Sequence, residues 1–159
     1  MTAWKFMFVA IVLCTTTTFA QEDTVKVGEM SGTDITFTFD EQDIIDAVEY
    51  DLNDGTQIYL VYPAYVSSTK ARVIAEGDTI LVAYECFIDG SGDVYCTAVA
   101  IKNTCKGDPY NCCKFLEDDS GTIYGCTCDL LKDIRCQGSW CDHGQEDNSA
   151  GFIEYLSAL

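Results

Sequence analysis

The segment TILVAYECFIDGSGDVYCTAVAI, from Thr79 to Ile101, predicts a β-hairpin with one cysteine on each arm. Two glycines in the turn Asp89–Asp93 supply the positive φ angles that a tight connection needs. If the turn is centred on Ser91, Cys86 faces Cys96. Directly opposed residues have Cα atoms ~4.5 Å apart, within the ~4.4–6.8 Å that a disulfide accepts, so this register predicts a Cys86–Cys96 disulfide. The same register predicts the pairs Phe87–Tyr95, Tyr84–Ala98, Val82–Ala100 and Leu81–Ile101.

Seven further cysteines follow this hairpin, which is an odd number. In an oxidising compartment such a cluster normally pairs into disulfides, and three bonds would leave one thiol over. The adjacent Cys112 and Cys113 are expected to bond to different partners. The remaining thiol is either free and buried, or it bridges two chains in a disulfide-linked homodimer. The cysteines whose pairing the sequence leaves open are Cys105, Cys112, Cys113, Cys126, Cys128, Cys136 and Cys141.

Zinc is the main alternative fate for clustered cysteines, and their spacing argues against it. Structural zinc sites usually separate paired ligands by two to four residues, and no C-x-x-C occurs here. The single histidine, His143, offers one ligand at most. We therefore expect no metal site, and a second half of the chain that is held together by disulfides.

The N-terminal residues 1–20, MTAWKFMFVAIVLCTTTTFA, have the layout of a secretory signal peptide. Phe6–Leu13 is an apolar run well short of the ~20 residues that span a membrane. Small residues precede the expected cleavage after Ala20, and Cys14 would leave with the leader. The sequence thus predicts a secreted, extracellular protein of 139 residues, from Gln21 to Leu159.

The expected mature chain is strongly acidic, with 8 Lys and Arg against 26 Asp and Glu, a net charge of −18. A polyanion of this size is repelled by nucleic acids and by anionic membrane surfaces. The charge favours a basic protein partner or divalent cations. It also keeps a secreted protein soluble, whatever its partner.

Hydrophobic patterning predicts an α+β fold for the mature chain. Thr33–Phe39 alternates polar and apolar residues, as in a half-buried strand. Asp40 is placed to cap a short amphipathic helix that ends near Asn53, although Ile44–Tyr50 would also tolerate an extended conformation. We expect residues 21–102 to form a small antiparallel β-sheet with one short helix. A disulfide-stapled, cysteine-rich loop region at 103–142 is expected to pack on the sheet, and an acidic and apolar C-terminal tail follows at 143–159.

Motifs for catalysis are weak in this chain. A Cys–His nucleophile would need Cys141 and His143 within hydrogen-bond reach, and two residues this close on a loop have no special reason to achieve it. The chain has many carboxylates, but their spacing does not identify two that could act as the acid and base of a hydrolase. The segment DLNDGT begins like an EF-hand loop, yet Thr56 stands where the loop needs glycine and Tyr62 where it needs an acidic ligand. We expect no enzyme and no cofactor, with weak calcium binding as an open alternative.

The sequence favours a secreted, disulfide-rich, non-enzymatic binding protein of the inhibitor, effector or ligand type, with an extracellular and basic protein partner. The alternative is an acidic extracellular matrix or calcium-associated structural protein. Aromatic side chains near irregular backbone either anchor protein interfaces or fill a thin core. The residues predicted to contact the partner are Tyr59, Tyr62, Tyr65, Trp140, Glu117, Asp118 and Asp119.

Overall fold

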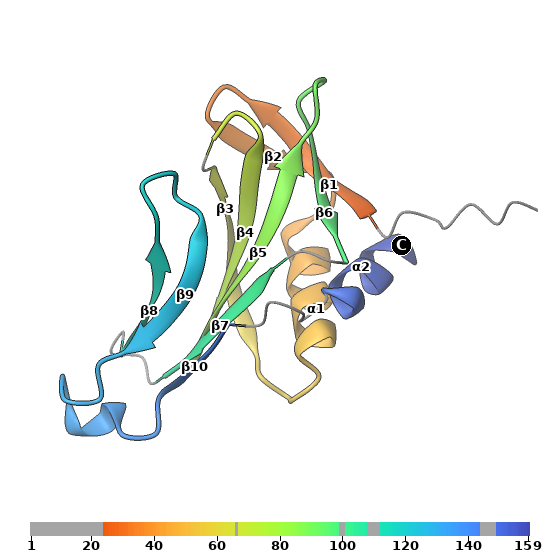
Figure 1. The fold of residues 1–159 in the computed structure, drawn as a ribbon. Helices are drawn as coiled ribbons and strands as arrows, with labels where there is room; N and C mark the ends of the chain where they lie inside the picture. Colours follow the sequence, from red (N-terminus) through yellow and green to blue (C-terminus); the bar gives the residue numbers. More distant parts are fainter. Residues whose placement is uncertain (1–23, 66, 99–100, 108–111, 144–148) are drawn as a thin grey trace, which may run out of the picture.

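The computed structural model describes residues 24–65, 67–98, 101–107, 112–143 and 149–159 (Figure 1). The predicted signal peptide lies outside the described residues. Strands dominate the described part, and two short α-helices accompany them. In chain order the elements are β1 (Thr24–Ser31), β2 (Asp34–Phe37), α1 (Glu41–Leu52), β3 (Ile58–Tyr65), β4 (Lys70–Gly77), β5 (Ile80–Ile88), β6 (Asp93–Thr97), β7 (Lys102–Lys106), β8 (Cys113–Glu117), β9 (Ile123–Cys128), η1 (Ile134–Cys136), β10 (Trp140–His143) and α2 (Ala150–Ser157).

Eight of these strands form one antiparallel sheet in which β5 is the branch point. On one side β5 pairs with β4, and β4 pairs with β3. On the other side the first half of β5 pairs with β7 and the second half with β6. From there β7 continues to β10, while β6 continues to β1 and β2. The sheet therefore divides into two arms beyond β5.

The β5–β6 hairpin has the predicted register near its turn. Cys86 faces Cys96, Phe87 faces Tyr95, and a disulfide joins the two cysteines across a Cα–Cα distance of 4.3 Å. The register predicted farther from the turn is wrong, because β6 ends at Thr97 and β7 takes the same edge of β5. The pairs found there are Leu81 with Cys105, Val82 with Thr104 and Tyr84 with Lys102.

Helix α1 begins and ends where the sequence predicts. The Asp40 side chain accepts a hydrogen bond from the Asp43 backbone N–H at 2.8 Å, and the Asp43 carboxylate accepts one from the Asp40 N–H. This reciprocal capping satisfies N–H groups that the first turn would otherwise leave unpaired. Asn53 closes the helix in the left-handed conformation, at φ 47°. The buried side of α1 faces the sheet through Ile44, Ala47 and Val48.

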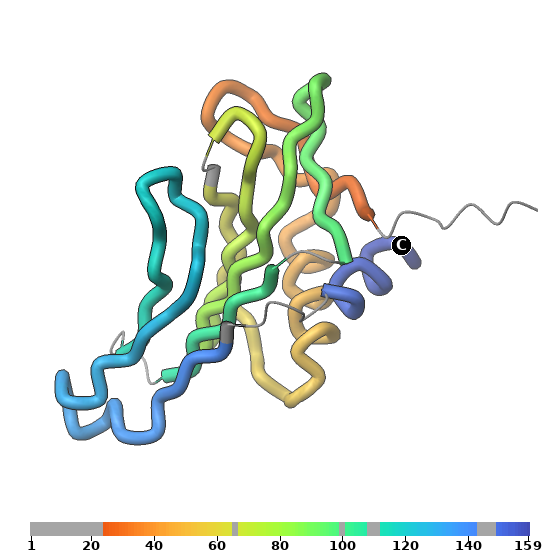
Figure 2. Tube along the Cα trace, in the orientation of Figure 1, coloured from red at the N-terminus to blue at the C-terminus, as the bar shows by residue number. Residues whose placement is uncertain are grey.

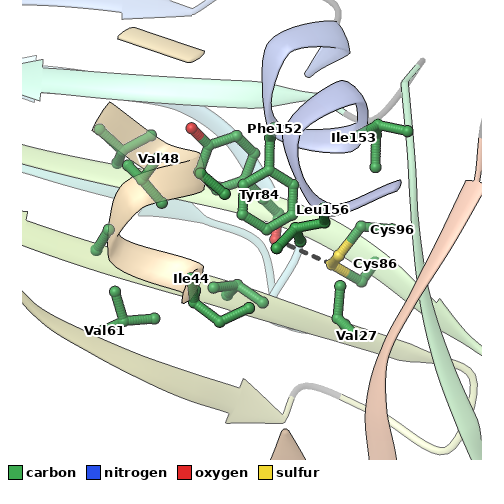
Figure 3. Close-up of a cluster of buried hydrophobic side chains, with 14 of the residues drawn as sticks. Val27, Ile44, Val48, Val61, Tyr84, Cys86, Cys96, Phe152, Ile153 and Leu156 are labelled. Carbon is green, nitrogen blue, oxygen red and sulfur yellow. Dashed lines mark hydrogen bonds between the residues drawn. A yellow bond between two sulfur atoms is a disulfide. The ribbon is translucent and has the colours of Figure 1, made fainter. Parts of the chain in front are cut away.

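The C-terminal segment forms a second helix, α2, so the prediction of a single helix is wrong, and this helix occupies residues 150–157 of the predicted tail at 143–159. Phe152, Ile153 and Leu156 are buried, and they lie on one side of the helix at helical spacing. A helix of eight residues has little stability alone and depends on its packing. The Phe152 ring stacks on Tyr84 with centroids 4.6 Å apart, which ties α2 to the central strand (Figure 3).

Helices and ribbon occupy opposite faces of the sheet (Figure 1). On the helix side, a large core gathers the side chains of α1, α2 and the inner strand positions (Figure 3). On the other side, strands β8 and β9 form a separate two-stranded ribbon. A much smaller cluster of Ile74, Ala83 and Ile123 lies between ribbon and sheet.

The cysteine-rich region, residues 103–142, holds more regular structure than the loops that were predicted. It contributes β7, β8, β9 and β10, as well as the short helix η1. Its strands are only four to six residues long, and its few apolar residues do not form the long alternating pattern that marks a strand in sequence. Backbone pairing and cross-strand disulfides stabilise these strands in place of a continuous apolar face.

Candidate functional site

Three disulfides organise the chain after β7. They join Cys112 to Cys136, Cys113 to Cys128 and Cys126 to Cys141. The adjacent cysteines therefore bond to different partners, as the sequence predicts. Residues 129–139 begin directly after Cys128, which bonds to Cys113, and they contain Cys136, which bonds to Cys112. We call this segment, between β9 and β10, the stapled loop; it projects beyond one end of the sheet (Figure 2).

The stapled loop exposes large apolar side chains to solvent. Leu131 is 96% exposed and Ile134 is 79% exposed. Leu130 and the adjoining Trp140 are about half exposed. Residues 130–140 thus hold four of the ten exposed large apolar or aromatic side chains in the described part of the chain. Single exposed apolar residues are ordinary, whereas several gathered in one short segment are typical of an interaction site.

Hydrogen bonds hold the backbone of the stapled loop in one conformation. The Asp129 N–H donates to the Cys112 carbonyl at 2.8 Å, and the Leu131 N–H donates to the Asp129 carboxylate at 3.1 Å. The Asp133 carboxylate caps η1 by accepting from the Arg135 N–H at 3.0 Å. Hydrogen bonds from the Arg135 guanidinium and its backbone N–H hold the pKa of Asp133 well below its usual range. Local bonds and disulfides together preorganise the loop.

Two of the predicted partner-binding residues lie at the end of the sheet from which the stapled loop projects. Tyr59 is 59% exposed near the start of β3, and Trp140 begins β10. Strand pairing places both there, because Ile58 faces Gly77 while Lys106 faces both Ile80 and Trp140. A partly open cavity of about 110 Å³ lies beside Tyr59. Its other walls include Asp78, Leu81, Cys105, Gly107 and Cys112.

The other predicted contact residues lie elsewhere. Tyr62 is half-buried under the ribbon, and its hydroxyl donates to the Glu76 carboxylate at 3.4 Å. Burial, followed by the nearby Glu76 charge, raises the pKa of Tyr62. Tyr65 is the last residue of β3. The structure therefore does not bring the three tyrosines together as one exposed row.

The acidic residues Glu117, Asp118 and Asp119 lie at the turn of the β8–β9 ribbon, away from the stapled loop (Figure 1). Glu117 forms an ion pair with Arg72 of β4 at 3.3 Å. Asp118 accepts backbone hydrogen bonds from Ser120 and Thr122, and its hydrogen bonds with these two residues lower its pKa. Glu117 and Asp118 therefore hold the ribbon turn and its contact with the sheet, and Asp119 is exposed.

Negative charge is concentrated away from the stapled loop. Residues 24–101 contain fourteen acidic and three basic residues, whereas residues 102–143 contain seven and five. The stretch 40–54, which includes α1, holds seven acidic residues and no basic one. Two of its carboxylates pair with lysines of β7: Asp51 with Lys102 at 3.0 Å, and Asp54 with Lys106 at 3.2 Å. The helix side of the molecule is therefore acidic.

One thiol and one disulfide meet where β7, β9 and β10 lie together. Among the described cysteines, Cys105 of β7 is the free one, and it is buried, with 2% of its surface exposed. Burial raises the pKa of the Cys105 thiol to about 11. Its sulfur and those of Cys126 and Cys141 all lie within 4.8 Å of one another. Among the described residues, no other three cysteine, histidine or carboxylate side chains come close enough together to hold a metal ion. The carboxylates of α1 in particular do not converge in this way.

Sequence reasoning missed Leu131 and Ile134 as candidate contact residues. Their signal is the pair Leu130–Leu131 and a nearby isoleucine, set in an otherwise polar stretch between two cysteines. An apolar pair within a short disulfide-bounded loop has little core to enter. The prediction favoured aromatic and acidic residues instead, and only Tyr59 and Trp140 of that set share the loop's end of the sheet.

Comparison of this chain with protein-family models, with curated proteins and with solved structures finds no match. Neither of the two described α-helices is long and apolar enough to cross a membrane.

Proposed function

We propose that this protein is a secreted, disulfide-rich, non-enzymatic binding protein whose stapled loop docks on an extracellular, basic protein partner. The observation that carries the proposal is the high exposure of Leu131 and Ile134, which lie between the disulfide-bonded Cys128 and Cys136. Four disulfides are typical of proteins from oxidising compartments, in keeping with export.

The energetics support the stapled loop as the anchor of an interface. Full burial of a leucine or isoleucine side chain contributes about 1.5–3 kcal/mol. Ordering a flexible loop on binding would offset much of this gain, since each immobilised side chain costs about 0.5–1.5 kcal/mol. The disulfides, together with the hydrogen bonds that the Asp129 and Asp133 carboxylates accept from backbone N–H groups, order the loop when the protein folds. The entropy of ordering the loop is therefore lost on folding and not on binding. Leu131 and Ile134 therefore contribute more of their burial energy to affinity.

The charge distribution supports a basic partner. The acidic helix side attracts a cationic protein over long range and raises the association rate at low salt. The stapled loop itself is close to neutral, because Lys132 and Arg135 accompany Asp129 and Asp133. Apolar contact at the loop and electrostatic attraction by the rest of the molecule therefore act as separate contributions. Added salt should weaken the electrostatic attraction and leave the apolar contact unchanged.

Affinity capture from extracellular fluid, followed by binding measurements on the purified captured protein, tests this function. We expect Leu131→Ser combined with Ile134→Ser to weaken binding at least tenfold, or about 1.4 kcal/mol. Leu159→Ser is the matched control, since Leu159 is also well exposed, at 67%, and lies at the end of the chain after α2. Equal binding by the wild type and the double variant would contradict the proposal, as would a partner that salt does not affect.

The excess of carboxylates at residues 40–54 suggests one second candidate, a calcium-associated structural protein, although the carboxylates of α1 do not converge on a common site. Carboxylate oxygens are the ligands that calcium prefers. A large rise in melting temperature with millimolar calcium would support this candidate over the binding protein. An unchanged melting temperature would reject it.

A further inference from the structure

Cys105, Cys126 and Cys141 come from three different strands, β7, β9 and β10, and their sulfurs converge. The disulfide joins Cys126 to Cys141, and the Cys105 sulfur lies 4.0 Å from the Cys141 sulfur. The Cys105 thiol is therefore a direct neighbour of the disulfide, and its side chain must rotate into line with the S–S bond before it can attack.

Strand register favours a different bond from the one present. Cys105 and Cys141 face each other directly in the antiparallel β7–β10 pair. Directly opposed residues lie ~4.5–5.5 Å apart at Cα, which suits a disulfide. Cys86 and Cys96 form such a cross-strand bond in this same sheet. The backbone is therefore built to accept Cys105–Cys141 as well as Cys126–Cys141, whose Cα atoms are 5.9 Å apart.

We propose that these three sulfurs form an exchangeable set in which Cys105 displaces Cys126 from Cys141 and so creates a reactive thiol at Cys126. Burial raises the pKa of the Cys105 thiol, so its thiolate is a minor species and the exchange is slow. That thiolate attacks the Cys141 sulfur. A Cys105–Cys141 bond forms as the Cys126–Cys141 bond breaks, and Cys126 leaves as a thiolate that takes up the proton lost by Cys105. The number of disulfides is unchanged, so the step needs no oxidant or reductant.

The exchange moves the free thiol from a buried to a more accessible position. Cys105 is buried in β7, whereas Cys126 is only partly buried in β9 of the outer ribbon. It also breaks the disulfide that joins β9 to β10. The Cys126 thiolate can then attack an external disulfide, forming a mixed disulfide and releasing the other half as a thiol. The Cys126 position would thus be a modification site for extracellular disulfides, independent of the function proposed for the stapled loop.

Alkylation of the native, full-length secreted protein tests this exchange. The protein is incubated for hours at pH 8 with iodoacetamide and no denaturant, quenched with acid and digested with trypsin without reduction. Uncatalysed rearrangements take minutes to hours. Cys105 lies in the tryptic peptide Asn103–Lys106, whereas Cys126 and Cys141 lie in peptides that the Cys112–Cys136 and Cys113–Cys128 disulfides hold together. Asn103–Lys106 is therefore released alone when Cys105 is free, and it stays linked to the other cysteine peptides when Cys105 is bonded to Cys141. We expect the label on Cys126, with Asn103–Lys106 disulfide-linked to the peptide that contains Cys141.

Two variants provide controls. Cys105→Ala should lose the Cys126 label completely, because no internal thiol remains to displace it. Cys126→Ala should contain a Cys105–Cys141 disulfide in the folded protein. Label confined to Cys105, or no label together with an intact Cys126–Cys141 bond, would overturn the proposal. So would labelling of Cys126 that persists in Cys105→Ala, or free thiols at both Cys105 and Cys141 in Cys126→Ala.

Discussion

Two regions of this molecule reach a fixed shape by different physical means. The body, residues 24–101 together with α2, surrounds a large apolar core and contains one disulfide, Cys86–Cys96. The stapled region, residues 102–143, contains three disulfides and contributes Ile123 as its buried residue to the small second core. Short, polar strands bury too little apolar surface to offset the entropy of ordering them. Disulfides supply the missing stability, and they allow apolar residues to remain on the surface.

The largest expected effect breaks the body. Phe152→Ala removes a fully buried ring that stacks on Tyr84, and we expect it to lower the free energy of unfolding by about 3–5 kcal/mol. Urea denaturation followed by circular dichroism measures the change. A loss below about 1 kcal/mol would show that α2 is not part of the core.

The second expected effect breaks the stapled region. Replacing both Cys112 and Cys136 by alanine opens a loop with a sequence separation of 24 residues. Chain entropy predicts a loss of about 3 kcal/mol in stability. Proteolysis of the native protein locates the change, and we expect new cleavage within the stapled loop. Unchanged resistance of this loop would contradict its dependence on the disulfide.

A smaller effect concerns the electrostatic link between the two regions. Hydrogen bonds with Thr56, followed by the contacts with Lys106, lower the pKa of Asp54. A carboxylate with a lowered pKa in the folded state stabilises it above the usual carboxyl pKa, and this contribution is lost as the pH falls through the lowered value. Asp54→Asn should cost less than about 1 kcal/mol at pH 7, since the pair is partly exposed. The difference from wild type should vanish in acid; a difference that grows on acidification would contradict this account.

The smallest effect on stability is expected at the surface that we assign to binding. Leu131→Ser should change the free energy of unfolding by less than about 0.5 kcal/mol, because the side chain is almost fully exposed. Thermal melts of Leu131→Ser and Phe152→Ala, each compared with the wild type, measure how differently the two substitutions affect stability. A large loss of stability would place Leu131 in a core and remove it from the candidate site.

Sequence reasoning succeeded where the determinants are local. The α1 caps at Asp40 and Asn53 and the Cys86–Cys96 hairpin turn depend on residues that are near one another in the chain. It failed where distant segments compete for the same partner. The sequence gives no sign that β7 replaces β6 along β5, or that α2, which begins at Ala150, covers the same face as α1, which ends at Leu52. Likewise, the disulfide partners of Cys112 and Cys113 depend on how the ribbon packs, which spacing alone does not determine.

Amide hydrogen exchange before and after mild reduction tests the contrast between the two regions most directly. Exchange protection reports the local stability of each strand. After reduction, we predict that the amides of β8 and β9 lose their protection while those of β4 and β5 keep theirs. Simultaneous loss in all four strands, or protection of β8 and β9 that survives reduction, would contradict the claim that disulfides hold the stapled region and an apolar core holds the body.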